Sequence, residues 1–377
     1  MKIGILGLPS SGKTTVFQAL SGFKTDANNF KKETHRAIVK IPDPRLDQLV
    51  QYYQPNKTVH ATIEYVDVVV ENEKKPLSDS ILGIFKTMDV FVQVVRAFEN
   101  QEVPHPKTKI DYYRDLQDME TELILKDLVI VENNLDKLER VLKAEKKQEN
   151  LLRQEVLLKA KQMLEDGKPL RALSLTPEEE NIIKIYQFLS IKPQLIVINI
   201  DENQNPEDYL PKAKEYYKDI PMTSVMALCG KIEMEIAQLS PEDQKEFIEE
   251  LNIQEPALHR MIAESFRLLQ LMIFFTVGKD EVRAWIIPQN TKAPQAAGTI
   301  HSDFEQGFIR AETFHYDDLV QAEGSEQKVK ENGKFRLEGK EYIVKDGDIL
   351  NIEYIVKDGD ILNIRFNVKK NKFNYKS

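Results

Sequence analysis

The stretch GLPSSGKTT, Gly7–Thr15, constrains the fold of this chain more than any other feature. Its spacing is G-x-x-x-x-G-K-T, and the apolar run KIGIL comes directly before it. A loop of this kind turns main-chain N–H groups inward around phosphates, with the Lys13 amine on the β- and γ-phosphates and the Thr14 hydroxyl on Mg²⁺. The run TTVFQAL after the loop has helical apolar spacing, which would place the phosphates at a helix N-terminus. The sequence therefore predicts a nucleotide site that includes Pro9, Ser10, Ser11, Gly12, Lys13, Thr14 and Thr15.

Apolar runs typical of buried strands recur along the chain, with helical stretches between them. They are KIGILG, AIVKI, TIEYVDVVV, DVFVQVV, QLIVINI and MTSVMA. This alternation predicts an α/β fold, with a nucleotide-binding domain on a mostly parallel sheet that is covered on both faces. A chain of 377 residues is long enough for two or three domains.

The strand pattern stops between residues 116 and 191. Apolar residues recur there at intervals of three and four, as one face of a helix requires: Leu128, Val131, Leu135, Leu138 and Leu142. A second helical stretch, 151–164, follows the charged turn AEKKQEN, so we expect an antiparallel coiled-coil arm inserted into a nucleotide-binding domain of residues 1–115 and 192–275. Thr176 is expected to cap a further helix, with Glu179 completing a capping box. A purely structural arm and a partner-binding arm remain alternatives.

The segment 276–368 has short β-like runs and Gly-Asp turns, which predict a small sheet-rich domain followed by a tail at 369–377. The run EYIVKDGDILNI occurs at 341–352 and again, letter for letter, at 353–364. Each copy predicts a β-hairpin that turns at KDGD. A folded domain needs only one of the two copies.

Composition limits the functions that this chain can have. A net charge of −9 argues against wholesale wrapping of nucleic acid, and no DNA specificity is evident. No apolar run approaches the roughly 18 residues of a membrane span. A lone cysteine, Cys229, excludes an internal disulfide, and the six histidines show no metal-ligand spacing. We therefore expect a cytoplasmic protein, monomeric and without structural zinc.

The choice of base is indicated after the run QLIVINI. Guanine-specific P-loop proteins read their base with N-K-x-D, whereas this chain has Asn199-Ile200-Asp201-Glu202. Glu202 moves the reading carboxylate by one methylene, and a base edge left unpaired in a closed site loses on the order of 1–3 kcal/mol per group. Adenine lacks the two-donor edge of guanine, so it is favoured. The alternative is that Asn199 and Glu202 only cap the next helix.

Nearly the whole chain resembles the YchF, or Obg-like ATPase, family of P-loop proteins. The matching stretches are GLPSSGKTT, IPDPRLD, KDLVIVENNLDKLERV, DGKPLRALSLTPEEE, NIDE, CGKIEMEI and the long run from Phe274 to Phe314. Besides the Mg²⁺ cofactor already expected at Thr14, the resemblance implies ATP preferred over GTP, a helical arm, a small α+β TGS domain at residues 276–368, and association with the ribosome. It also implies that the loop Leu228, Cys229 and Gly230 closes over the base through its backbone.

The sequence departs from that family in both switch regions. Asp67 is retained and can hold Mg²⁺ through water, but Val70 stands where the family has a γ-phosphate-sensing glycine. Thr34 is the nearest candidate for the Mg²⁺-binding threonine of the first switch, three residues out of register. Loss of one backbone donor of this kind lowers a rate by about 10²–10³. With Lys13 and Asp67 as the catalytic residues, three functions stay open: a slow ATPase, a hydrolysis-deficient nucleotide-stabilised scaffold, and a GTPase.

Overall fold

A computed structural model describes residues 1–22, 34–68, 79–145, 147–251, 253 and 255–354. By their internal contacts the residues form two units. The first contains Met1–Val39 and Ile63–Leu269, and the second contains Lys40–Thr62 and Gln270–Ser377.

In the described part of the chain, the first unit holds a six-stranded sheet of order β2-β4-β1-β5-β6-β7. Strand β1 pairs in parallel with β4 and β5, and the pairs β5–β6 and β6–β7 are also parallel. Every residue of β5 and β6 is buried, as in a sheet covered on both faces. The predicted α/β fold is confirmed, and all six expected strands are present: β1 Lys2–Leu6, β2 Thr34–Lys40, β4 Thr62–Val68, β5 Val90–Arg96, β6 Gln194–Asn199 and β7 Thr223–Leu228.

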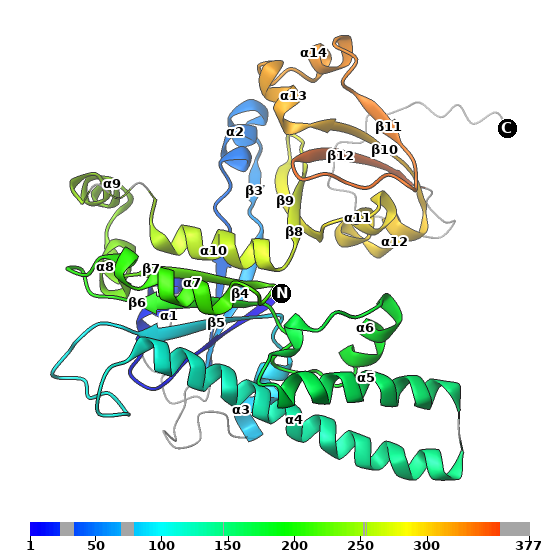
Figure 1. Cartoon of the computed structure of the whole chain (residues 1–377). Coiled ribbons are helices and arrows are strands. Elements are labelled where there is room, and N and C mark those ends of the chain that lie inside the picture. The colour runs from blue at the N-terminus through cyan, green and yellow to red at the C-terminus, as the bar shows by residue number, and fades with distance from the viewer. Residues whose placement is uncertain (23–33, 69–78, 146, 252, 254, 355–377) are drawn as a thin grey trace. The chain divides into compact units, whose positions relative to one another are not determined.

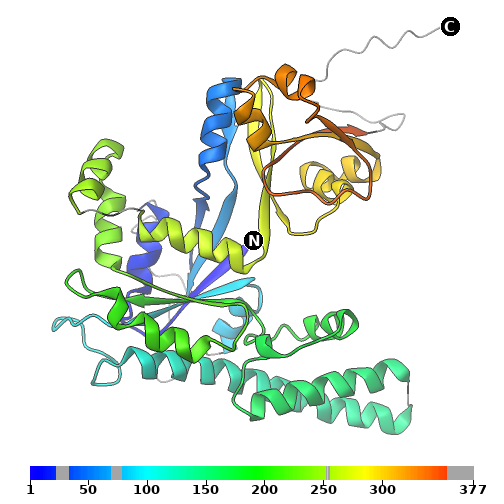
Figure 2. The same ribbon diagram turned by 45° about the horizontal axis from the view of Figure 1, so that its top comes forward.

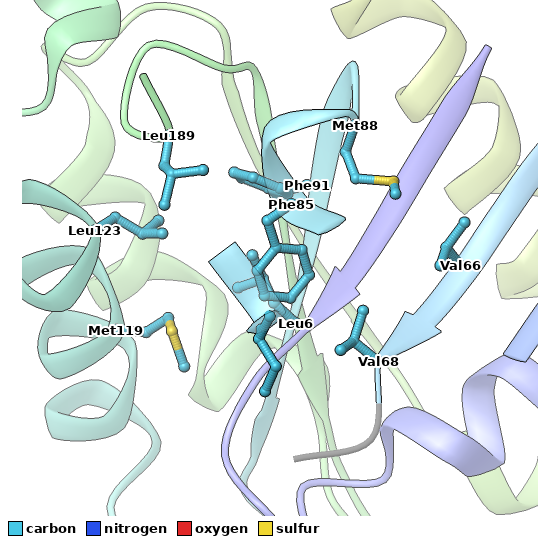
Figure 3. Packing of buried hydrophobic residues seen from close by; sticks show 10 residues of the cluster. Leu6, Val66, Val68, Phe85, Met88, Phe91, Met119, Leu123 and Leu189 are labelled. Atoms are coloured by element: carbon cyan, nitrogen blue, oxygen red, sulfur yellow. The ribbon is translucent and has the colours of Figure 1, made fainter. Parts of the chain in front are cut away.

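Helices cover both faces of this sheet (Figures 1 and 2). Helix α10, Ala257–Leu268, lies on one face and α4, Tyr112–Ala144, on the other. Figure 3 shows the core on the α4 side, where the β1 residue Leu6 packs with side chains of β4, β5 and α4. The remaining helices of the unit are α1 Lys13–Ser21, α3 Asp79–Lys86, α5 Gln148–Glu165, α6 Pro177–Lys184, α7 Leu210–Tyr217, α8 Gly230–Gln238 and α9 Pro241–Glu250.

This core fixes the end of β1, from which the phosphate loop starts. Leu6 is 2 % exposed, and Phe85 meets Phe91 edge to face with ring centroids 5.4 Å apart. A Cβ on Gly4 would lie 2.9 Å from the Met88 Cγ, so a larger residue there would have to displace the Met88 side chain. The strand is therefore held on a rigid base as it enters the loop.

The arm has the predicted helical form. Helix α4 has 33 residues, about 50 Å at 1.5 Å per residue, and α5 packs against it. The predicted apolar face is confirmed, because Val131 and Leu142 are buried and Leu128, Leu135 and Leu138 pack beside them. The capping box of Thr176 and Glu179 at α6 is present as well. Helix α5 begins at Gln148, so the connection is shorter than the expected turn AEKKQEN.

Buried charges anchor the arm to the sheet. The carboxylate of Glu120 on α4 pairs with Arg171, and both side chains are about 2 % exposed. Arg171 also donates to the Thr223 Oγ1 of β7 at 2.8 Å. Asp127 accepts hydrogen bonds from the main-chain N–H groups of Leu189 and Ser190 and from the Ser190 hydroxyl. The chain that leaves the arm is thus tied to α4 at the point where it returns to the sheet.

The second unit has a sheet of order β11-β10-β12-β8-β9-β3 within the described residues. Its central pairs β8–β9 and β10–β12 are antiparallel, whereas β12–β8 and β3–β9 are parallel. The helices α11 and α12 pack on the sheet around the Phe308 side chain. The bounds are β3 Lys57–Val59, β8 Leu271–Thr276, β9 Glu281–Pro288, β10 Phe308–His315, β11 Arg336–Glu338, β12 Asp348–Tyr354, α2 Pro44–Tyr53, α11 Ala293–Ile300, α12 Ser302–Gln306, α13 Tyr316–Gln321 and α14 Glu326–Glu331.

The division into units differs from the expected boundaries in two places. Residues 40–62 were expected in the nucleotide-binding domain, but β3 pairs with β9 and the segment groups with the second unit. The second sheet also begins at Leu271 and not at 276. A strand of three residues carries no alternation that sequence reasoning can detect, which is why β3 was missed.

The expected hairpin in the first copy of the repeat is wrong. Ile343 forms an isolated bridge with Lys292, and β12, which starts at Asp348, pairs with β10 and β8 instead of with its own upstream half. The turn at Gly347, φ +85°, is present, and the Asp348 carboxylate accepts the Lys345 N–H inside it at 2.8 Å. The two halves are thus joined by a turn but have partners elsewhere. β12 runs into the second copy, whose remainder after Tyr354 lies outside the described residues.

Among the helices that the structure describes, none has the length and apolar character that a membrane crossing requires.

Candidate nucleotide-binding site

The loop between β1 and α1 has backbone conformations that require glycine. Gly7 has φ +147°, and a Cβ there would lie 2.3 Å from the Val94 carbonyl oxygen. Gly12 has φ +92° and caps α1, and its Cβ would lie 2.1 Å from the Asn199 Nδ2. Substitution at either position strains the loop and displaces a neighbouring strand end. The loop conformation therefore explains both glycine positions of the motif.

Lys13 lies at the first position of α1 and folds back over the loop. Its Nζ donates to the carbonyl oxygens of Gly7 at 2.9 Å and Leu8 at 2.8 Å. Burial lowers the pKa of Lys13 to about 8, and the nearby Asp67 carboxylate opposes this shift. A buried ammonium whose acceptors are neutral carbonyls is a site prepared for an anion.

Thr14 and Asp67 meet at the mouth of the loop. The Thr14 hydroxyl donates to Asp67 Oδ2 at 3.3 Å, and His35 Nδ1 lies 3.5 Å from the same oxygen. Asp67 is 1 % exposed, and its Oδ1 accepts no hydrogen bond from the residues that the structure describes. A hydroxyl and a carboxylate with a spare oxygen are the hard donors that Mg²⁺ prefers, so these residues fit that ion.

Of the two switch residues, Thr34 is not brought to this pair. Thr34 is at the start of β2, where side chains alternate between faces, and His35 is the residue that reaches Asp67. Thr34 therefore points to the opposite face of the strand. Val70 lies outside the described residues.

A pocket of about 430 Å³ opens beside the loop. Its walls come from the ends of β1, β5, β6 and β7, where parallel α/β sheets bind their ligands. The lining residues are Ser10, Gly12, Lys13, Thr14 and Thr15 from the phosphate loop, Phe98, Glu99, Asn100 and Val103 after β5, Asn199, Ile200 and Asp201 after β6, and Cys229, Lys231 and Met234 after β7.

Some of the predicted site residues do not line the pocket. Ser11 is buried, and Leu228 is 3 % exposed at the end of β7. Glu202 is directed to the rim, where it forms an ion pair with Lys231 at 3.2 Å. The predicted residues that do not line the pocket are Pro9, Ser11, Glu202, Leu228 and Gly230, with Asp67 close to it through Thr14.

Asn199 joins two loops of the site. Its Nδ2 donates to the Ser11 carbonyl at 3.1 Å, and its Oδ1 accepts the Gly230 N–H at 3.0 Å. Asn199 is 4 % exposed, and these two bonds to main-chain groups use both the nitrogen and the oxygen of its amide. Asn199 therefore fixes the β7–α8 turn to the phosphate loop, a role that neither base reading nor helix capping had suggested.

Several wall residues were missed by the sequence analysis. Phe98, Asn100 and Val103 follow β5, and Lys231 and Met234 belong to α8. Their only sequence signal is their place just after a parallel strand, whereas Asn199 had been selected by comparison with the N-K-x-D motif. Cys229 does line the pocket, and burial raises the pKa of its thiol, which disfavours the reactive thiolate.

The strand, glycine loop and helix, with Lys13 inside and Thr14 beside an aspartate, define a P-loop nucleotide-binding protein. A model of the family YchF-GTPase_C, described as a protein of unknown function (DUF933), matches residues 271–353. The chain is 40% identical over 360 residues to the "Ribosome-binding ATPase YchF" of Escherichia coli O157:H7, which covers 93% of this chain and 98% of that protein. It belongs to the YchF, or Obg-like ATPase, family.

Further relatives agree with this membership. The "Obg-like ATPase 1" of Oryza sativa subsp. japonica is 36% identical over 360 residues, covering 93% of this chain and 91% of that protein. The solved structure of the Schizosaccharomyces pombe YchF GTPase superposes with a TM-score of 0.81 at 29% identity, covering 94% of this chain and 97% of that one.

Proposed function

We propose that this chain binds ATP with Mg²⁺, prefers ATP to GTP, and hydrolyses it slowly. The observation that carries the proposal is Lys13, a buried ammonium held by carbonyl oxygens at the N-terminus of α1. The helix N-terminus and the loop N–H groups add a positive potential at the same place. A polyphosphate tail is the ligand that this arrangement fits best.

Each residue of the loop then has a defined task. Lys13 transfers its N–H donors from the Gly7 and Leu8 carbonyls to the β- and γ-phosphate oxygens. The Thr14 hydroxyl and the spare oxygen of Asp67 would hold Mg²⁺, which when bound neutralises charge between the phosphates. Asn199 keeps Gly230 and the phosphate loop together while the base enters the pocket.

The base preference follows from the end of β6. The carboxylate of Glu202, at the position where guanine-specific proteins have their aspartate, is paired with Lys231 at the rim and does not line the pocket. Ile200 lines it in place of the usual lysine. Guanine would leave its two donors without that carboxylate, whereas adenine has none there to lose. A competition titration with both nucleotides tests this choice, and tighter binding of GTP would contradict it.

For slow hydrolysis there is a specific alternative function. Val70, in place of the γ-phosphate-sensing glycine, favours a hydrolysis-deficient scaffold that nucleotide merely stabilises. A single-turnover assay with γ-labelled ATP separates the two functions, with Lys13→Ala as the control. Phosphate release above that control supports the ATPase, and release equal to the control supports the scaffold.

We also propose that the protein associates with the ribosome in the cytoplasm. Support comes from the curated relatives named "Ribosome-binding ATPase" and from the arm, where Leu125 and Val129 are 50% and 56% exposed one helical turn apart on α4. Exposed apolar side chains that adjoin on one helix face offer a surface that a partner can cover. Cosedimentation with ribosomes is expected for the wild type and reduced for the variant Leu125→Asp, Val129→Asp. Equal cosedimentation would remove the arm from the proposed contact.

A further inference from the structure

Arg96, the last residue of β5, is buried beside the pocket, and among the described residues none of its hydrogen-bond acceptors is a carboxylate. It is 1 % exposed and is among the largest fully buried side chains of the described residues. Its guanidinium donates to four main-chain carbonyl oxygens: Phe98 at 3.1 Å, Val103 at 3.0 Å, Asn100 at 3.2 Å and Ser10 at 3.4 Å.

These four acceptors all belong to residues that line the pocket. Phe98, Asn100 and Val103 form the wall that follows β5, and Ser10 belongs to the phosphate loop. The Arg96 guanidinium also lies over the Phe98 ring, 4.5 Å from its centroid. One side chain therefore connects the wall at one side of the pocket to the loop that receives the phosphates.

The phosphate loop is held by other hydrogen bonds besides those of Arg96, whereas the wall 98–103 depends more on Arg96. The phosphate loop is held independently by Asn199 at Ser11 and by Lys13 at Gly7 and Leu8. The wall 98–103 has no regular secondary structure in its hydrogen bonding, and its carbonyls converge on Arg96. Loss of Arg96 should release the wall more than the loop.

We propose that Arg96 is a positioning residue for the nucleoside: it holds the wall 98–103 at the distance from the phosphate loop that a nucleoside requires. This inference rests on the proposed nucleotide-binding function of the pocket. Only arginine suits the role, since its donors diverge in one plane and reach carbonyls in different directions. Lysine has a single nitrogen and cannot span them.

The test compares Arg96→Lys with a matched control, Arg171→Lys. Arg171 is equally buried in the same unit but lies at the root of the arm, paired with Glu120. Dissociation constants for MgATP and for inorganic tripolyphosphate are measured by calorimetry on the full chain. Arg96→Lys should weaken MgATP binding by about tenfold or more and tripolyphosphate binding by less than about threefold. Arg171→Lys should change both by less than about twofold.

The outcomes separate the two proposals. Wild-type protein that fails to bind MgATP overturns the proposed function and this inference with it. If the wild type binds MgATP but Arg96→Lys keeps the wild-type preference for MgATP over tripolyphosphate, the positioning role alone is overturned. The same follows if Arg171→Lys loses as much MgATP affinity as Arg96→Lys. Arg96→Gln, which leaves no charge in the buried site, serves if the lysine variant does not fold, and the same loss of preference is expected. Thermal melting without nucleotide checks that each variant is folded.

Discussion

The root of the arm and the nucleotide pocket each contain a buried arginine, but the two arginines have different hydrogen-bond acceptors. At the root of the arm, Arg171 faces Glu120, and Tyr217 donates to the same carboxylate at 3.4 Å. In the pocket, Arg96 and Lys13 donate only to main-chain carbonyls among the bonds described for them. Dipoles satisfy the donors there but do not cancel the charge.

This difference separates a structural site from a binding site. Opposite charges that meet inside the protein leave nothing for a ligand to add, so the Glu120–Arg171 pair serves to attach the arm. Lys13 has the Asp67 carboxylate nearby but donates its hydrogen bonds only to carbonyls, so it gains when an anion takes their place. Substitutions at the root of the arm should therefore change stability, and substitutions in the pocket should change nucleotide binding.

The largest effect is expected for Glu120→Gln. Removing the carboxylate leaves Arg171 buried without its counter-charge, which should lower the free energy of unfolding by about 3–5 kcal/mol. Urea titration measures this loss, and MgATP affinity in the folded variant should equal that of the wild type. A matched loss of nucleotide affinity would show that the two regions are not separable.

Lys13→Met should show the reverse behaviour. Nucleotide binding should weaken by about 10²–10³, because a charge-assisted bond to phosphate worth about 3–4 kcal/mol is removed. The free energy of unfolding without nucleotide should not fall, since burial already opposes the charge of Lys13. Calorimetry and urea titration measure the two quantities. A variant that is less stable yet binds as well as the wild type contradicts the comparison.

The pH dependence of stability provides a third test at the root of the arm. Burial raises the pKa of Asp127 to about 6, so the folded state binds a proton that the unfolded state has lost between about pH 4 and pH 6. Over that range the stability of the wild type should fall with rising pH by up to about 3 kcal/mol relative to Asp127→Asn, and stay level above it. Urea midpoints measured at several pH values check the slope. If the stability of the wild type relative to Asp127→Asn instead rose with pH over this range, the raised pKa of Asp127 would be contradicted.

The smallest effect is expected at the rim of the pocket. Lys231 and Glu202 pair at 3.2 Å, but their side chains are 61% and 42% exposed. Water screens such pairs, so Lys231→Met should leave the urea midpoint unchanged. A clear drop would mean that the rim contributes to stability and that the division between the regions is less sharp.

The sequence predicted those parts of the molecule that depend on local pattern. Alternating strands and helices, the leucine face of α4 and the Thr176 cap all follow from neighbours in the chain, and so does the loop around Lys13. Resemblance to a family then added the TGS identity of the C-terminal domain and association with the ribosome.

The parts that were missed depend on contacts between distant segments. β3 belongs to the second sheet because of its pairing with β9, and the repeat forms no hairpin because β12 pairs with β10 and β8. Asn199 was selected for reading a base, but Ser11 and Gly230 occupy its amide. The role of Arg96 depends on four carbonyls that converge only in the folded chain.

The central claim is that the pocket takes an adenine nucleotide by its phosphates. Calorimetric titration of the wild-type protein with ATP and with GTP, each with Mg²⁺ and with chelator, tests it most directly. We expect ATP to bind more tightly than GTP and to lose affinity when Mg²⁺ is removed. Equal or tighter binding of GTP, or no binding of either nucleotide, would contradict the account.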